Sequence, residues 1–351
     1  MDVATRAKAP MHLGVWYDFR NPAAWRIPWQ QLYNETLDQA RWAEELGFNS
    51  IWLSEHHFTD DGYMPSLPTA LGAIAARTER VRLGTAVLLA PLHHPLRLAE
   101  DLAVVDLISN GRLDVGLAVG YRSKEFEVMA VPRSERGRRT EETVALLRLA
   151  WSGRPFSFDG ACYRFEDVTV TPPPAQSPSP PIFLGGSSIP AARRAGRLGC
   201  GFVADSGGSL DLYEVYADAF TVVEGGLEAP EIRTNRLVYV CSDPERAWEM
   251  LGSHLLYQHN VYAQWAREAG DPATRQTDLR TPAELSTGSY LIGTSQQVLD
   301  ELKHVFEAGP VTEVIFWARP PGVTLEDSSA SLQLIADEIL PALASDAGVR
   351  Q

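Results

Sequence analysis

Short runs of valine, isoleucine and leucine alternate with longer segments of helical spacing along most of this chain. Short apolar runs bounded by polar or turn residues are typical of buried strands, whereas apolar residues that recur every three or four positions are typical of amphipathic helices. The runs predict strands at residues 11–17, 50–54, 80–89, 112–120, 182–186, 201–205, 236–241 and 313–318. The helical segments cover residues 29–46, 65–78, 95–109, 136–151 and about 189–198, and three more begin at residues 243, 295 and 325.

The alternation of strand and helix predicts the fold class. Strands that are apolar on both faces and separated by helices are typical of a parallel sheet. Eight such units close most simply into a (β/α)8 TIM barrel, and 351 residues are enough for one barrel with insertions. We therefore predict an α/β protein with a single TIM-barrel domain over residues 1–351, whose chemistry takes place at the carboxyl ends of the strands.

Four segments fall outside the alternation. Residues 1–10 are expected to form a flexible N-terminus, and residues 156–170 predict a β-excursion from the barrel. The sequence TPPPAQSPSPP at residues 171–181 predicts a rigid, proline-rich connector. Residues 263–289 are polar and show no strong strand pattern. A long insertion of this kind is typical of a mobile loop over an active site.

The composition narrows the class of partner. The formal net charge of -14 argues against binding to nucleic acid or to anionic membrane surfaces, since both attract positively charged proteins. No apolar run approaches the ~18 residues of a membrane span, and residues 1–10 lack the apolar centre of a signal peptide. The three cysteines show no C-x-x-C spacing. We therefore expect a cytoplasmic protein that binds a small molecule.

One predicted strand ends in chemically active side chains. In SIWLSEHHF the strand runs directly into Glu55, His56 and His57, at the edge where a barrel carries its catalytic groups. A histidine at this place can also be a hydrogen-bonded residue of the barrel rim. A zinc hydrolase that uses these residues with His93 or His94 is a further alternative. Because neighbouring residues of a strand face opposite ways, one metal ion would not easily gather this set, and we predict no metal site.

A second stretch has the features of an anion site. In IFLGGSSIPAARRAGRLG a strand ends in Gly185, Gly186, Ser187 and Ser188, and a helix follows at once. Free backbone N–H groups and the helix dipole attract an anion at such a place, the glycines admit a close approach, and the serines add donors. A tight turn with a serine N-cap would give the same pattern. Neither a Walker A loop nor a dinucleotide fingerprint opens a helix in this chain.

Four motifs together resemble the bacterial luciferase-like family of flavin-dependent monooxygenases and oxidoreductases, over nearly the whole chain. They are EHHF, GTAVLLAPLHHPLRLAEDLAVVD, GRLDVGLAVGYRSKEF and LGGSS, in this order. The resemblance implies a reduced flavin at the top of the barrel, with His56 as the catalytic histidine that handles a proton. It also implies cofactor contacts at Thr85, Ala86, Gly120, Tyr121, Gly185, Gly186, Ser187 and Ser188.

The resemblance carries two finer expectations. The segment Thr85-Ala86-Val87 matches the place where the family has a β-bulge with a non-prolyl cis peptide bond that supports the isoalloxazine ring. The light-producing subunit of luciferase carries a cysteine and a phosphate-binding arginine where this chain has Ala118 and Val119. That difference argues against light emission. It also leaves the identity of the cofactor open. FMN is favoured, and an 8-hydroxy-5-deazaflavin coenzyme is the alternative.

From the resemblance we predict a two-component flavin-dependent monooxygenase. A separate flavin reductase would supply reduced FMN, because the chain has no NAD(P)-binding fingerprint of its own. With O2 the reduced flavin would form a C4a-hydroperoxide that oxygenates a small organic substrate under a loop that excludes water. The alternatives are a deazaflavin-dependent hydride-transfer enzyme and a non-catalytic flavin-binding partner subunit. We also expect a homodimer. The aromatic residues around the first strand–helix loop are candidates for a substrate pocket: Trp16, Tyr17, Phe19, Trp25 and Trp29.

Overall fold

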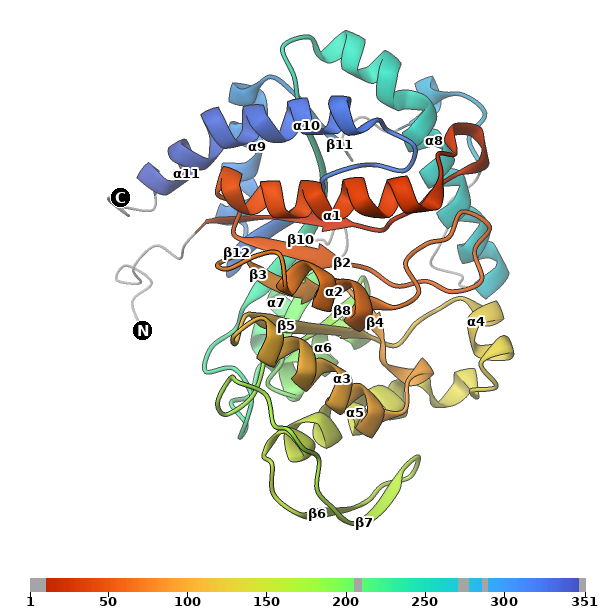
Figure 1. Cartoon of the computed structure of the whole chain (residues 1–351), viewed down its shortest axis with the longest axis vertical. Helices are drawn as coiled ribbons and strands as arrows, with labels where there is room; N and C mark the ends of the chain where they lie inside the picture. The colour runs from red at the N-terminus through yellow and green to blue at the C-terminus, as the bar shows by residue number, and fades with distance from the viewer. Residues whose placement is uncertain (1–10, 205–209, 271–277, 286–289, 347–351) are drawn as a thin grey trace.

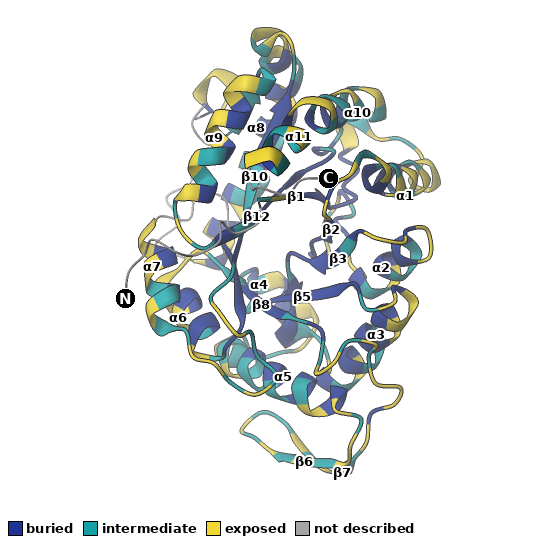
Figure 2. Cartoon of the chain, turned by 90° about the vertical axis from the view of Figure 1, so that its left-hand side faces the viewer, coloured by how far each residue is buried: buried dark blue, intermediate teal, exposed yellow. Residues whose placement is uncertain are grey.

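The computed structural model describes residues 11–204, 210–270, 278–285 and 290–346. Within them, parallel strands form a closed barrel that is surrounded by helices (Figures 1 and 2). Each barrel strand pairs with the next in the order β1, β2, β3, β5, β8, β9, β10 and β12, and β12 pairs with β1 to close the ring. The predicted α/β TIM barrel is confirmed.

The barrel strands are β1 (His12–Tyr17), β2 (Ser50–Leu53), β3 (Arg82–Thr85), β5 (Leu113–Ala118), β8 (Ile182–Gly186), β9 (Gly201–Ala204), β10 (Ile232–Val240) and β12 (Val311–Trp317). The short strand β4 (Leu88–Leu89) pairs with the end of β5, and β11 (Tyr290–Gly293) pairs with the second half of β10. The antiparallel pair β6 (Phe156–Asp159) and β7 (Arg164–Val168) projects from the barrel, where the sequence predicted a β-excursion (Figure 1).

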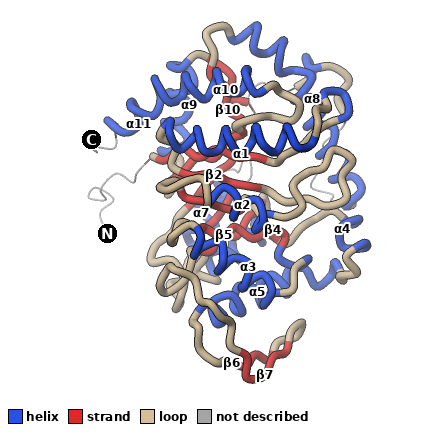
Figure 3. Tube along the Cα trace, in the orientation of Figure 1, coloured by secondary structure: helices blue, strands red, loops and turns tan. Residues whose placement is uncertain are grey.

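Helices pack around the outside of the barrel (Figure 3). They are α1 (Trp29–Leu46), α2 (Leu67–Ala75), α3 (Pro95–Ile108), α4 (Ser123–Val128), α5 (Arg136–Trp151), α6 (Ile189–Arg197), α7 (Leu210–Ala219), α8 (Pro244–Ala269), α9 (Ser295–Glu307), α10 (Leu325–Leu334) and α11 (Leu340–Asp346). The sequence pattern missed α4 and α7. Of the helices described, none combines the length and the apolarity that a membrane span requires.

The seventh barrel strand begins earlier than its apolar pattern predicted. We expected a strand at residues 236–241, but β10 begins at Ile232, and residues 232–236 are the ones that pair with β12 and, in part, with β9. This segment is polar because the Arg233 guanidinium lies inside the barrel, 4.0 Å from the ring centroid of Phe183 and 4.8 Å from that of Trp52. Residues 237–240 pair instead with β11, which the sequence pattern did not predict.

The loop predicted over residues 263–289 also begins later than expected. Helix α8 continues to Ala269 and ends at Gly270, which adopts the left-handed conformation of a helix C-cap with a φ of 65°. The prediction was wrong for residues 263–269, because Ala263 and Trp265 are buried on the inner face of this helix. Residues 271–277 and 286–289 lie outside the described residues, as do residues 1–10. The mobility of the loop and of the N-terminus stays a prediction.

The proline-rich connector at residues 171–181 is hydrogen-bonded to the barrel at Gln176 and at Pro181, whose carbonyl accepts from the backbone N–H of Val115 at 2.8 Å. The backbone N–H of Gln176 donates to Asp106 Oδ2 at 2.9 Å, and its side-chain amide donates to Asp106 Oδ1 at 2.7 Å. The same amide donates to the carbonyl of Leu113 at the start of β5 at 2.7 Å. The connector therefore follows the barrel wall closely.

Two apolar layers surround the strands. Alternate residues of a strand face opposite sides, so Tyr17 joins the layer between barrel and helices, whereas Trp16 joins the layer inside the barrel. The rings of Trp16 and Trp317 stack inside the barrel with centroids 4.2 Å apart. The inner layer therefore fills the barrel with large side chains beneath the carboxyl ends of the strands: Trp16, Trp52, Phe183, Val203, Ile315 and Trp317.

A buried ionic cluster lies inside the barrel near the amino ends of the strands. Arg233 Nη1 donates to Asp114 Oδ2 at 2.7 Å, and Arg233 Nε lies 3.3 Å from Glu313 Oε2. Arg82 Nε also donates to Asp114 Oδ2, at 2.7 Å. Asp114 is fully buried. Charges taken out of water are tolerated only when they are paired. Asp114 is the carboxylate that both arginines share, and Arg233 has Glu313 as a further partner.

Replacing Asp114 should therefore destabilise the barrel. The substitution Asp114→Asn leaves two arginines beside a neutral amide, and we expect the free energy of unfolding to fall by about 3–5 kcal/mol, the usual cost of breaking a buried pair. Urea unfolding followed by circular dichroism measures this change. The control is Asp159→Asn, which breaks an exposed pair with Arg164 and should cost less than about 1 kcal/mol. Equal losses in the two variants would show that the buried cluster does not stabilise the fold.

Candidate active site at the carboxyl ends of the strands

The residues that the sequence singled out lie at the carboxyl ends of four neighbouring strands. His56 follows β2, Ala86 follows β3, Gly120 follows β5, and Gly185 and Gly186 end β8. These strands stand side by side in the barrel in that order. Because parallel strands present their carboxyl ends at one edge, the fold brings segments that are far apart in the sequence to one rim.

A buried carboxylate holds His56. The Nδ1 of His56 donates to Glu125 Oε1 at 2.9 Å. The backbone N–H of His57 and the Nη1 of Arg122 donate to the same oxygen, at 2.9 and 3.0 Å. Arg122 also donates to the carbonyl of His57 at 2.7 Å. Glu125 belongs to α4 and is fully buried. The loop after β2 is thus fastened to the segment after β5.

The charges around His56 determine which ring nitrogen carries the proton. Burial alone would raise the pKa of Glu125, but the hydrogen bonds from His56 and His57 and the charge of Arg122 lower it overall. The carboxylate is therefore ionised and can only accept hydrogen bonds. Burial lowers the pKa of His56, and Glu125 offsets only part of that effect. Near neutral pH the imidazole is neutral, with its proton on Nδ1 and with Nε2 as a proton acceptor.

Aromatic rings cover His56. The ring centroids of Tyr63 and Trp265 each lie 4.8 Å from that of His56, and those of Tyr121 and Tyr262 lie at 5.7 and 6.4 Å. Tyr262 and Trp265 come from the last turns of α8. His56 is only 7% exposed. The end of α8 therefore keeps bulk water away from this imidazole.

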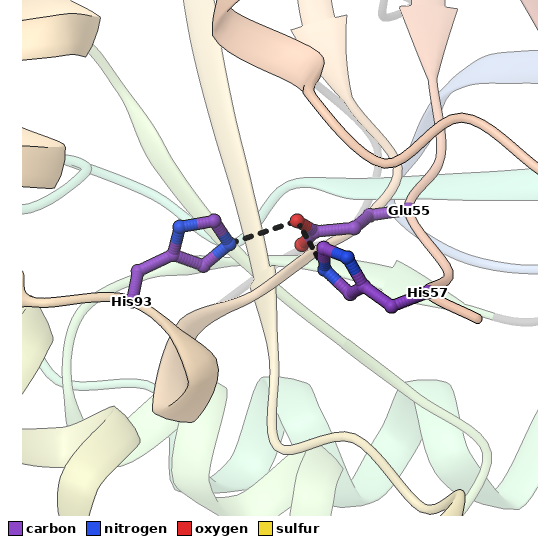
Figure 4. Close-up of side chains that lie close together, drawn as sticks. All are labelled: Glu55, His57 and His93. Carbon is purple, nitrogen blue, oxygen red and sulfur yellow. Dashed lines mark hydrogen bonds and ion pairs between the residues drawn. The ribbon is translucent and has the colours of Figure 1, made fainter. Parts of the chain in front are cut away.

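Glu55 and His57 form a second cluster, together with His93 (Figure 4). The Nε2 atoms of His57 and His93 donate to Glu55 Oε1 at 3.0 and 2.8 Å, and the backbone N–H of Leu89 donates to Glu55 Oε2 at 2.6 Å. Burial opposes ionisation of Glu55, but His93 and His57 lower its pKa to about 2. Burial likewise opposes the charged form of His93, but Glu55 raises the pKa of His93 overall.

The ligand atoms of Glu55, His57 and His93 lie within 4.8 Å of one another, close enough for a metal site. The sequence argument held that one metal ion would not easily gather Glu55, His56, His57 and His93 or His94, and it did not foresee that three of these residues meet. Metal-binding imidazole nitrogens must be unprotonated, whereas both Nε2 atoms donate a proton to an ionised carboxylate. Without a metal ion the set is a hydrogen-bonded support for the loop after β2, and a metal ion would have to displace both protons. The absence of a metal site stays a prediction.

The segment after β3 adopts the backbone geometry that the resemblance predicted, since the peptide bond Ala86–Val87 is cis. Thr85 Oγ1 donates to the carbonyl of Gly116 at 2.6 Å and accepts from its N–H at 2.8 Å. The hydroxyl of Thr85 is therefore engaged with β5, and only its backbone is available to a cofactor. The side chain of Val87 lies against Gly185, where a Cβ would stand 2.6 Å from Val87 Cγ1.

Gly120 and Tyr121 join β5 to α4. Gly120 has a φ of 70°, which favours glycine, and a Cβ there would stand 3.2 Å from the ring of Phe126. This turn directs the following residue to the site, where the Tyr121 ring meets the His56 ring edge-on.

The loop after β8 combines a turn, a cap and a helix start. The Ser188 side chain accepts from the backbone N–H of Ala191 at 3.4 Å, as an N-cap of α6. Ser187 and Ser188 are exposed. A Cβ on Gly186 would stand 2.5 Å from the Cβ of Ala191, so only glycine lets β8 run this close to α6. The serine cap that the sequence offered as the alternative is present, and the anion site stays a prediction.

Sequence reasoning missed Glu125 and did not assign Arg122 or His93 to the site, since His93 entered only as a possible ligand in the zinc alternative. Glu125 and Arg122 lie within the motif GYRSKEF, but a glutamate in a polar turn carries no signal that its partner is 69 residues away. His93 could have been found from its position, because it follows β4 at the same rim as His57. His94, considered with it, is exposed and packs against Phe165 at 5.7 Å instead.

A family model described as luciferase-like monooxygenase matches residues 11–312. The chain is 30% identical over 331 residues to the oxygenase component of a flavin-dependent trigonelline monooxygenase from Acinetobacter baylyi. This match covers 89% of this chain and 90% of the relative. The chain is also 28% identical over 321 residues to an F420-dependent glucose-6-phosphate dehydrogenase from Microbacterium testaceum. This second match covers 88% of this chain and 93% of the relative.

A solved structure supports the same assignment. A monooxygenase from Streptomyces bottropensis matches with a TM-score of 0.80 and 27% sequence identity, over 95% of this chain and 99% of that chain. Both kinds of relative, flavin-dependent and F420-dependent, are enzymes. The family match over most of the length, the barrel and the residues gathered at its rim agree, and the chain belongs to the luciferase-like monooxygenase family.

Proposed function

We propose that this protein is the oxygenase component of a two-component flavin-dependent monooxygenase. In this proposal it receives reduced FMN from a separate reductase and uses O2 to oxygenate a small organic substrate. The observation that carries the proposal is the buried His56–Glu125 pair under its cover of aromatic rings. The trigonelline oxygenase component, similar over 89% of the chain, favours oxygenation among the reactions of the family.

The reductase follows from the sequence and from the same relative. No dinucleotide fingerprint opens a helix in this chain, so it lacks the usual means of binding a nicotinamide reductant. The relative is named an oxygenase component, and a component needs a second protein that supplies its reduced cofactor.

The rim of β3, β5 and β8 fits a phosphorylated flavin. Gly185 and Gly186 carry no side chain that would shield their backbone N–H groups. In the first turn of α6 only the N–H of Ile189 can add to them, because Pro190 has no N–H and those of Ala191 and Ala192 donate to Ser188. Together with Ser187 and Ser188 these groups would hold the phosphate. Ala86, Gly120 and Tyr121 would contact the rest of the cofactor. When bound, reduced flavin supplies the electrons with which one oxygen atom of O2 enters the substrate and the other leaves as water.

The chain's own contribution is to manage a proton and to exclude water. His56 Nε2 accepts a proton, and the ionised Glu125 stabilises the imidazolium that results. Tyr63, Tyr262 and Trp265 close around this imidazole. A reaction that depends on a water-sensitive oxidant gains from such a cover, because water would otherwise consume the oxidant.

A second function on the same barrel is favoured by the similarity to F420-dependent glucose-6-phosphate dehydrogenase over 88% of the chain. In that function the protein would transfer a hydride between an organic substrate and a deazaflavin, without O2. The rim of the barrel and His56 would serve both reactions, so the two are separated by the cofactor and by the fate of oxygen.

Oxygen labelling separates these two functions. The purified protein is given reduced FMN or reduced F420, each with and without 18O2, and a panel of small organic substrates that includes trigonelline. We expect a product that carries one 18O atom with reduced FMN only, measured by mass spectrometry. Oxygen-independent turnover with F420, and no labelled product with FMN, would overturn the proposal in favour of hydride transfer.

Variants of the His56–Glu125 pair test the proton role. His56→Ala should retain flavin binding while turnover falls by about 100-fold or more, the scale of acid–base catalysis. Glu125→Gln should lower turnover by about 10-fold to 100-fold, as for residues that orient another. Because the carboxylate favours the protonated imidazole, its loss lowers the pKa of His56 further. The limb of the pH–rate profile that reports His56 should therefore move to lower pH.

The matched control for Glu125→Gln is Glu127→Gln, since Glu127 lies on the same helix and is exposed. The control should leave turnover and the pH profile unchanged. If Glu125→Gln lowered turnover without shifting the profile, its role would be structural. If His56→Ala kept full turnover, the imidazole would have no part in the reaction.

A further inference from the structure

We propose that Arg122 is a positioning residue that holds the end of α8 over His56. Its guanidinium lies over the Trp265 indole, with Cζ 4.1 Å from the ring centroid. The same guanidinium donates to Glu125 Oε1 and to the carbonyl of His57. One side chain therefore joins the helix that covers His56 to the carboxylate that orients it. The inference rests on the proposed function in one respect, namely that the cover excludes water from a reaction that water would spoil.

The two halves of α8 are attached to the barrel in different ways. The first half contributes aliphatic side chains to the apolar layer inside the barrel: Ala247, Leu251 and Leu255. Trp265, in the last turns, is only 6% exposed, yet neither apolar layer of the described residues includes it. The rings nearest to Trp265 belong to the cluster around His56, at 4.8 Å for His56 itself and 5.2 Å for Tyr262. The burial of Trp265 therefore depends on this cluster and on the guanidinium of Arg122.

An arginine suits this place because its guanidinium is planar. It can donate hydrogen bonds to Glu125 and His57 while it also lies against an aromatic ring. The side chain of Arg122 is 6% exposed, and a cation–π contact is stronger when both partners are out of water. Arg20 also faces this indole, but from 5.7 Å. A lysine in place of Arg122 would keep the positive charge but has no flat face to lie against the ring.

Other residues of the rim attach α8 nearer its middle. Arg20 Nη1 donates to the amide oxygen of Gln258, about two turns before the covering indole. The hydroxyl of Tyr262 is hydrogen-bonded to that of Tyr63 at 3.1 Å. These contacts remain when the indole loses its guanidinium, so we expect only residues 263–269 to be released.

The position of Arg122 also affects the proton of His56. Glu125 favours the protonated imidazole, whereas the charges of Arg122 and Arg20 and the burial of the ring oppose it. Phenols, which are uncharged near neutral pH, also face the imidazole: Tyr63, Tyr121 and Tyr262. Loss of Arg122 removes one opposing charge and admits water to the ring. Both changes raise the pKa of His56, whereas loss of Glu125 lowers it.

Hydrogen–deuterium exchange of the full-length protein, without flavin, tests the attachment. In Arg122→Met we expect the backbone amides of residues 263–269 to exchange about 5-fold to 30-fold faster, the scale of a buried cation–π contact. The amides of residues 246–254, in the first half of the same helix, should exchange as before. Trp265→Leu should give the same acceleration as Arg122→Met. The two substitutions together should add nothing more, because each removes the same contact.

A second variant separates the flat face of the guanidinium from its charge. Arg122→Lys keeps a positive charge beside Glu125, and it provides the test if Arg122→Met does not fold. We expect Arg122→Lys to accelerate exchange at residues 263–269 as well, because lysine cannot lie flat against the indole. The pKa of His56, measured by 15N nuclear magnetic resonance, should rise in Arg122→Met and rise less in Arg122→Lys.

The matched control is Arg139→Met, since Arg139 lies over the ring of Tyr163 at 5.3 Å but belongs to α5. It should leave the exchange of α8 and the pKa of His56 unchanged. Unchanged exchange at residues 263–269 in both Arg122 variants, additive effects of Arg122→Met and Trp265→Leu, or a pKa of His56 that does not rise would each overturn the proposal. None of these measurements uses a cofactor, so they decide the proposal independently of the oxygenase function.

Discussion

One carboxylate oxygen holds the candidate active site together. Glu125 Oε1 accepts hydrogen bonds from the imidazole of His56, the backbone of His57 and the guanidinium of Arg122. A buried carboxylate stays ionised only with such donors around it. The bonds from His56 and His57 tie the loop after β2 to the segment after β5, and the bond from His56 turns its imidazole so that Nε2 is the proton acceptor. Both the position and the chemistry of the histidine therefore follow from Glu125.

Much of the fold could be predicted from the sequence, because apolar periodicity reports burial directly. The predicted strands at residues 11–17, 50–54 and 182–186 differ from β1, β2 and β8 by no more than one residue at either end. The pattern failed where a polar residue is buried. Arg233 occupies the interior of the barrel with Asp114 and Glu313 as partners, and no apolar periodicity marks such a strand.

The site was predictable only in part, for a related reason. His56 could be found because it ends an apolar strand, and barrel geometry gives strand ends a meaning. Glu125 and Arg122 could not, because their roles depend on hydrogen bonds between loops that only the closed barrel brings together. The covering residue Trp265 lay in a stretch whose polar composition resembled a loop, although α8 carries it onto the His56 ring.

The most direct test of this account is the tautomer of His56, measured by 15N nuclear magnetic resonance on protein labelled at histidine. The account predicts a neutral imidazole at pH 7 that carries its proton on Nδ1, with a pKa below the usual value because the ring is buried. In Glu125→Gln the pKa should fall further. A His56 protonated on Nε2, or a charged imidazolium at pH 7, would contradict the claim that Glu125 sets this histidine as a proton acceptor.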